Sequence, residues 1–106
     1  MCVITPIDNL PSDPLDAAAL FHADHLPKIR HNTGAIRPSN IVLVFEPAGS
    51  EHHAWRLAAI QGLAREFAPI RANAVVGNEK DSLDDAIAFL HDAPGVTGQL
   101  LEVGNG

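Results

Sequence analysis

The run Ile41 to Phe45, with the sequence IVLVF, constrains the fold more than any other stretch of the chain. It has five apolar residues in succession and none of the polar alternation of a strand with one face in water. Such a strand is covered on both faces, which is the usual situation in a parallel sheet with helices packed against it. We therefore expect a protein of the α/β class.

Three further apolar runs predict the remaining strands, and they are Cys2–Ile7, Ala72–Val76 and Gln99–Val103. Helical spacing separates the runs. Ser12 or Asp13 can cap a first helix, whose apolar residues recur at spacings of three and four as far as Ile29. Pro27 should kink that helix or end it near Leu26, so the stretch RHNTGAIRPSN that follows is expected to be a loop.

Two more helices are expected in the second half of the chain. One starts at Ser50 and Glu51 and runs to Phe67, before a proline. The other covers residues 83–91, with Ser82 as its cap.

This order predicts a Rossmann-like half fold, a parallel four-stranded sheet with the sequence β-α-β-α-β-α-β. Right-handed crossovers that step in one direction place every helix on one face of the sheet, which gives two layers and leaves the other face short of cover. Three layers result if the last helix lies on the opposite face. At 106 residues the chain has room for one domain, so residues 1–106 are expected to form a single truncated domain of this kind.

Composition excludes several classes of function. The formal charge is −6 and the arginines are spread along the chain, so we expect no nucleic-acid surface. The single cysteine, Cys2, cannot form an internal disulfide and is expected to be a small buried apolar residue. The start, MCVITPIDNL, predicts neither a signal peptide nor a membrane span, so a cytoplasmic location is expected.

Two segments of the second half carry a family resemblance. LAAIQGLAREFAPIRANAV (57 to 75) and AIAFLHDAPGVTGQLLEVGNG (86 to 106) resemble the fifth helix, sixth strand and C-terminal segment of the short-chain dehydrogenase/reductase family. LDAAALFHADHLPKIR and NIVLVF are similar, more loosely, to that family's fourth helix and fifth strand. The resemblance covers nearly the whole chain, and it implies the C-terminal half of that family's fold.

The resemblance also locates the positions where the family carries its chemistry. The glycine-rich cofactor loop belongs to a first half that this chain is expected to lack. The family's serine position is occupied by Glu46, and its Tyr-x-x-x-Lys pair aligns with His53 and Leu57; the sequence contains no tyrosine. A leucine cannot lower the pKa of a neighbouring acid as the lysine does. The resemblance therefore implies a retained fold without catalysis, with no cofactor and no metal.

The same family pairs its fourth and fifth helices across a two-fold axis, which implies a homodimer through residues 14–30 and 51–67. Small residues on one side of the second of these helices would let another helix come close. The expected interface residues are Phe21, His25, Trp55, Ala58, Ala59 and Gly62. Association with a full-length dehydrogenase is the related alternative.

Other functions remain open. A pocket at the carboxyl ends of the strands, lined by Glu46, His53 and Asn78, would make the chain a small-ligand binder or an oxidoreductase-related enzyme. The histidines His52 and His53 with nearby carboxylates would also suit zinc or general-base chemistry. A third possibility is a subunit that completes a dinucleotide site with a partner.

Overall fold

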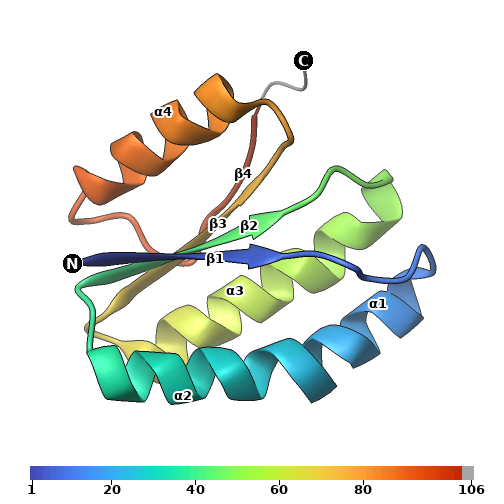
Figure 1. The fold of residues 1–106 in the computed structure, drawn as a ribbon, viewed down its shortest axis with the longest axis horizontal. Helices are drawn as coiled ribbons and strands as arrows, with labels where there is room; N and C mark the ends of the chain where they lie inside the picture. Colours follow the sequence, from blue (N-terminus) through green and yellow to red (C-terminus); the bar gives the residue numbers. More distant parts are fainter. Residues whose placement is uncertain (104–106) are drawn as a thin grey trace.

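The computed structural model describes residues 1–103 and confirms the α/β class. These residues form a four-stranded sheet in which every neighbouring pair of strands is parallel (Figure 1). The strands lie side by side in sequence order, and they are β1 (Cys2–Ile7), β2 (Asn40–Phe45), β3 (Arg71–Val76) and β4 (Leu100–Glu102). The four predicted strands are therefore all present, with small shifts at their ends.

The first helix is longer than predicted. It consists of α1 (Pro14–Leu20), a π-helical segment (Phe21–His25) and α2 (Leu26–Ile36), which follow one another without a break. The expectation that Pro27 ends the helix, and that the next residues form a loop, is wrong. Pro27 has no N–H to donate, and in the wider π turns before it the Leu26 N–H donates to the Phe21 carbonyl five residues back, so the chain continues past the proline.

The long helix ends where the backbone changes hand. Arg37 has a φ of 52°, its N–H donates to the Thr33 carbonyl at 2.9 Å, and Pro38 follows. A left-handed residue followed by proline cannot continue a helix.

The two later helices lie close to their predicted ranges. A short 3-10 turn (Ser50–His52) leads into α3 (His53–Phe67), and α4 spans Lys80–His91. The prediction that Ser82 caps α4 is wrong. Glu79 is the N-cap, and its carboxylate accepts hydrogen bonds from the N–H groups of Asp81 and Ser82 at 3.1 and 2.9 Å.

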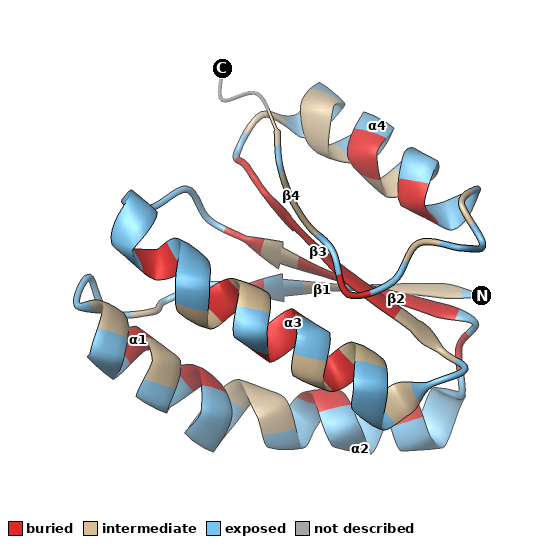
Figure 2. Cartoon of the chain, turned by 180° about the vertical axis from the view of Figure 1, so that it is seen from behind, coloured by how far each residue is buried: buried red, intermediate tan, exposed pale blue. Residues whose placement is uncertain are grey.

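The helices cover both faces of the sheet, so the fold has three layers. Figures 1 and 2 show α1, α2 and α3 on one face and α4 alone on the other. Every strand steps in the same direction, so the β3–α4–β4 crossover has the opposite hand to the two crossovers before it. Of the two arrangements that the sequence left open, the one with the last helix on the opposite face is observed.

Two apolar clusters lie on the two faces. The larger one joins α1 to α3 to the sheet through residues such as Phe21, Phe45 and Ile60. The smaller one is built on Val42, Val75 and Leu90 beneath α4. Alternation along the strands divides the side chains between the two clusters.

The α4 face is covered only in part. At β1 this face carries Ile4, which is 50% exposed, and Pro6, which is also exposed. The expectation that this face is short of cover is therefore wrong for β2 and β3, whereas on β1 an apolar strip remains open.

Arg71 and Asn73 hold α4 and β4 to the rest of the sheet. The Arg71 guanidinium donates to the carbonyls of Leu90 and Ala93, both at 2.8 Å, at the C-terminal end of α4. The buried Asn73 amide donates to the Val96 carbonyl and accepts from the Gln99 N–H, both at 3.0 Å. These bonds satisfy helix-end and loop groups that would otherwise need water.

Candidate functional site

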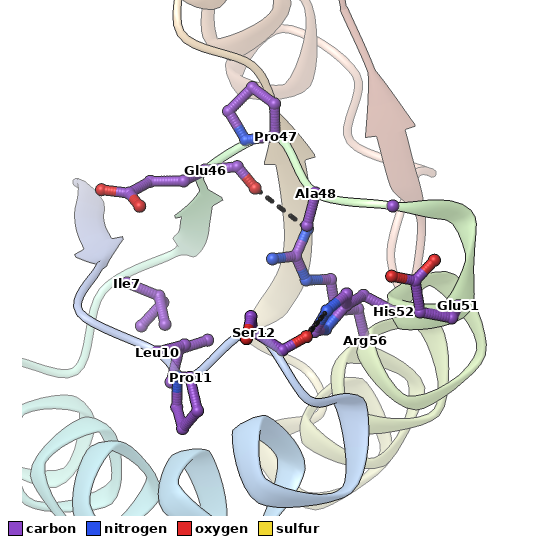
Figure 3. Close-up of a pocket in the computed structure, with 11 residues that line it drawn as sticks. Ile7, Leu10, Pro11, Ser12, Glu46, Pro47, Ala48, Glu51, His52 and Arg56 are labelled. Carbon is purple, nitrogen blue, oxygen red and sulfur yellow. Dashed lines mark hydrogen bonds between the residues drawn. The ribbon is translucent and has the colours of Figure 1, made fainter.

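A cavity of about 320 Å³ opens at the carboxyl ends of β1 and β2. Figure 3 shows how three segments build it: the end of β1 with the loop after it, the loop after β2, and the start of α3. Its lining residues are Ile7, Leu10, Pro11, Ser12, Glu46, Pro47, Ala48, Gly49, Glu51, His52 and Arg56. Parallel strands all end at this edge, and ligands of open α/β sheets bind outside it.

His52 is buried at the wall of this cavity, and both of its ring nitrogens are engaged. The Trp55 indole N–H donates to His52 Nδ1 at 3.1 Å. His52 Nε2 lies 2.9 Å from the Ser12 carbonyl oxygen, and it carries the proton because Nδ1 is the acceptor. The imidazole thus ties the loop after β1 to α3 and has no free nitrogen for general-base chemistry.

Arg56 is the charged group most deeply placed in the cavity wall. It is only 5% exposed, and its guanidinium carbon lies 4.7 Å from the centre of the Phe45 ring and 5.8 Å from that of Trp55. Nη1 donates to the Glu46 carbonyl at 3.1 Å. Burial lowers the pKa of Arg56, and the charges of Glu102 and Glu46 oppose that shift.

The Arg56 cation is incompletely paired. Its Nε is buried without a hydrogen-bond partner, and within residues 1–103 no carboxylate oxygen lies within ion-pair distance of the guanidinium. Two carboxylates line the same cavity without bonding to it. Figure 3 shows the Glu46 carboxylate directed away from Arg56. The Glu51 carboxylate folds back over Gly49, so closely that a Cβ at position 49 would collide with it.

The residues predicted to line a pocket do not all meet. Glu46 lines the cavity. His53 is exposed on the neighbouring position of α3, with Nδ1 3.9 Å from Glu102 Oε1, and Asn78 is exposed in the loop after β3. Neither His53 nor Asn78 is among the lining residues.

Sequence reasoning missed Arg56, and it proposed His52 for zinc or general-base chemistry, whereas both ring nitrogens of His52 are engaged in hydrogen bonds within the protomer. A signal was present, because His52, Arg56, Ala59 and Leu63 recur at helical spacing and all four are buried in the structure. Two polar residues within a buried stripe point to specific polar contacts.

Comparison with protein families identifies the chain. The family model described as short chain dehydrogenase-like protein matches residues 5–103, which is nearly the whole sequence. The chain belongs to the short-chain dehydrogenase-like family. The comparison with curated proteins found no match, and the comparison with solved structures found none either.

The cavity of this short-chain dehydrogenase-like chain lies where the resemblance places the family's catalytic serine. Glu46, at that position, begins the loop after β2. Leu57, at the position of the family's lysine, is partly buried and packs against the larger apolar cluster. The side chain at the lysine position therefore contributes to the core.

Other sites suggested by the sequence have ordinary surroundings. Among the residues that the structure describes, no group of three or more His, Cys, Asp or Glu side chains could hold a metal ion. Burial raises the pKa of the Cys2 thiol, opposed by the charges of Arg71 and the N-terminus, so the reactive thiolate is disfavoured. Within residues 1–103, no helix is both long and apolar enough to cross a membrane.

A second concave surface lies between the long first helix and α3. This helix groove, of about 200 Å³, is lined by Phe21, His22, Leu26, Arg30, Ala58, Ala59, Gly62, Leu63 and Glu66. At one end the Arg30 guanidinium donates to both Glu66 carboxylate oxygens, at 2.7 and 2.8 Å. The pairing raises the pKa of Arg30 and lowers that of Glu66.

The predicted interface residues occupy different depths around this groove. Ala58 is exposed and Gly62 is half-buried, whereas Ala59 and Phe21 are buried in the floor. Trp55 packs inside the protomer against the rings of Phe21 and Phe45, and His25 stacks on Phe21 with 6.1 Å between ring centres.

Proposed function

We propose that this short-chain dehydrogenase-like chain is a non-catalytic module that acts by association, first of all with a second copy of itself through the helix groove. The open side of α3 is the observation that carries the proposal. A Cβ added to Gly62 would meet no atom closer than Arg65 Nη2 at 4.0 Å, and Ala58 one turn earlier is exposed. Small side chains on an open helix surface let a second helix approach closely.

The charges at the end of the groove suit a two-fold arrangement. Arg30 and Glu66 form one exposed pair of opposite sign on each protomer. In an isologous contact both copies present the same surface, so each cation can approach the other copy's anion without leaving an unpaired charge.

Three observations support the absence of catalysis. The sequence has no tyrosine, and Leu57 at the lysine position packs into the apolar core. His52, the nearest imidazole in the cavity, uses both ring nitrogens in structural hydrogen bonds. The family's own proton relay, a phenolate activated by a lysine, therefore has neither of its two groups in this chain.

Light scattering after gel filtration tests the association. The chain is expected to run as a dimer, and Ala58→Arg should make it a monomer by placing a long cation in the groove. Ala88→Arg is the matched control, because it changes an exposed alanine on α4, on the opposite face of the sheet. A monomeric parent chain, or dissociation by Ala88→Arg alone, would contradict the proposed interface.

A fluorescence titration with NADH and NADPH tests the loss of the cofactor site. We expect no change in cofactor fluorescence at micromolar protein concentrations. Saturable binding at micromolar cofactor would show that a dinucleotide seat exists and would overturn the non-catalytic proposal.

A second candidate function is small-ligand binding at the carboxyl ends of the strands. The cavity on β1, β2 and α3 favours it, because it combines apolar walls with a buried cation and two carboxylates at a sheet edge where α/β proteins bind ligands. Binding of this kind is compatible with dimerisation, since the helix groove and the cavity have no lining residue in common.

A further inference from the structure

Among residues 1–103, Arg56 is the one cavity-lining side chain that has a buried polar atom without a hydrogen-bond partner. A guanidinium has five N–H donors, and the only hydrogen bond it makes among these residues is the one from Nη1 to the Glu46 carbonyl. Nε is buried without a partner. A buried cation of this kind is normally paired with an anion.

The environment of Arg56 holds the guanidinium in place at the cavity. The rings of Phe45 and Trp55 lie beside it, and the hydrogen bond to Glu46 fixes one end. Figure 3 shows the guanidinium at the cavity wall, between the loop after β2 and Ser12. A preorganised guanidinium loses little entropy when it binds a ligand.

We infer that the cavity binds a small organic carboxylate whose carboxylate group pairs with Arg56 and whose apolar part lies against Ile7, Leu10 and Pro11. This inference rests on the second candidate function, small-ligand binding, and it does not depend on dimerisation.

The sign and number of charges select this class of ligand. A planar carboxylate matches the planar guanidinium, and the pair forms charge-assisted hydrogen bonds that are stronger than neutral ones. Glu46 and Glu51 line the same cavity, so a dianion such as phosphate would meet two negative groups. A carboxylate with a single charge meets less repulsion, and the apolar residues from β1 and its loop contact the rest of the molecule.

The only tryptophan of the chain reports on this site, because Trp55 lies beside Arg56 and bonds to His52. Benzoate, neutral benzamide and inorganic phosphate can each be titrated while the Trp55 indole N–H is followed by NMR. Benzoate should shift this signal saturably, with a dissociation constant in the millimolar range as expected for a ligand of this size. Benzamide and phosphate should bind at least about tenfold more weakly.

Variants of Arg56 and Glu46 test the assignment of the charges. Arg56→Met should abolish the benzoate response, and Arg65→Met, which removes an exposed arginine on the same helix, should leave it unchanged. If Arg56→Met does not fold, Glu46→Gln serves instead, since removing an exposed carboxylate near Arg56 should tighten benzoate binding severalfold.

The outcomes separate this inference from the function on which it rests. Equal binding of benzoate and benzamide would overturn the carboxylate inference and leave a ligand-binding cavity. Tighter binding of phosphate than of benzoate would also overturn it. If none of the three probes binds, both the inference and the second candidate function are contradicted, and the dimer proposal is unaffected.

Discussion

Two polar residues of β3 attach α4 and β4 to the rest of the fold. Asn73 on β3 is fully buried and bonds to the backbone of residues 96 and 99, so it positions the start of β4. Arg71 bonds to the C-terminal carbonyls of α4. Both residues lie within the segment 57 to 75, one of the two that carry the family resemblance, and there they make structural contacts.

The N-cap of α4 gives a prediction about pH at the scale of one residue. Glu79 accepts bonds from the Ser82 hydroxyl and from the N–H groups of Ser82 and Asp81, which lower its pKa. A lowered folded-state pKa means that the stabilisation is fully present above the pKa of the unfolded glutamate and is lost as the pH falls through the folded pKa. Glu79→Gln should lower Tm modestly at neutral pH, and this difference should shrink in acid.

Thermal melts followed by circular dichroism, from neutral to acidic pH, measure this dependence. Ser82→Ala removes the strongest donor to the carboxylate and should show part of the same effect. A Tm difference for Glu79→Gln that does not change with pH would contradict a charged cap.

At the scale of elements, the two faces of the sheet are packed by apolar clusters of different size. The long first helix and α3 share a core with aromatic residues from both helices and from β2. The cluster beneath α4 has four buried residues within the described part of the chain. Since helix stability in proteins comes mainly from packing, α4 should be the less stable element.

Leu90→Ala tests this difference. Leu90 is fully buried beneath α4, and its truncation should cost about 2–5 kcal/mol of unfolding free energy. Phe89→Ala is the neighbouring control and should cost less, because Phe89 is 57% exposed. Denaturant unfolding measures both values, and hydrogen exchange should show α4 losing protection before α3. Equal loss of protection in the two helices would contradict the unequal packing.

At the scale of the whole molecule, the question is which uncovered surface associates. The helix groove offers small residues and a charged pair, and the open strip on β1 offers Ile4 and Pro6. The α4 crossover covers β2, β3 and the Cys2 end of β1, and it leaves Ile4 and Pro6 exposed. The two surfaces lie on opposite faces of the sheet, so one substitution can change either without the other.

Ile4→Lys separates the two surfaces. If the dimer forms through the helix groove, this variant should remain a dimer by light scattering. Its unfolding free energy should lie within about 0.5 kcal/mol of the parent chain, because the side chain is half in water. Ile36→Lys, at an exposed position at the end of α2 outside both surfaces, is the control. A monomeric Ile4→Lys variant would move the interface to the β1 strip.

The sequence by itself determined the strands, their parallel pairing and the family. Unbroken apolar runs such as IVLVF can be stable only between two layers, and that physical requirement is visible in one dimension. The resemblance in the second half of the chain agrees with the family match over residues 5–103.

Only the tertiary structure decided the path of the chain past Pro27, the face that α4 covers and the members of the cavity. A helix can continue past a proline through a π-helical segment, and sequence patterns do not indicate when it will do so. The position of α4 depends on packing beneath it, and this outweighed the usual handedness of crossovers. Arg56 lies on α3 and Glu46 in the loop after β2, ten residues earlier in the chain. The hydrogen bond from Arg56 to the Glu46 carbonyl forms only when the fold brings α3 and this loop together at the strand ends.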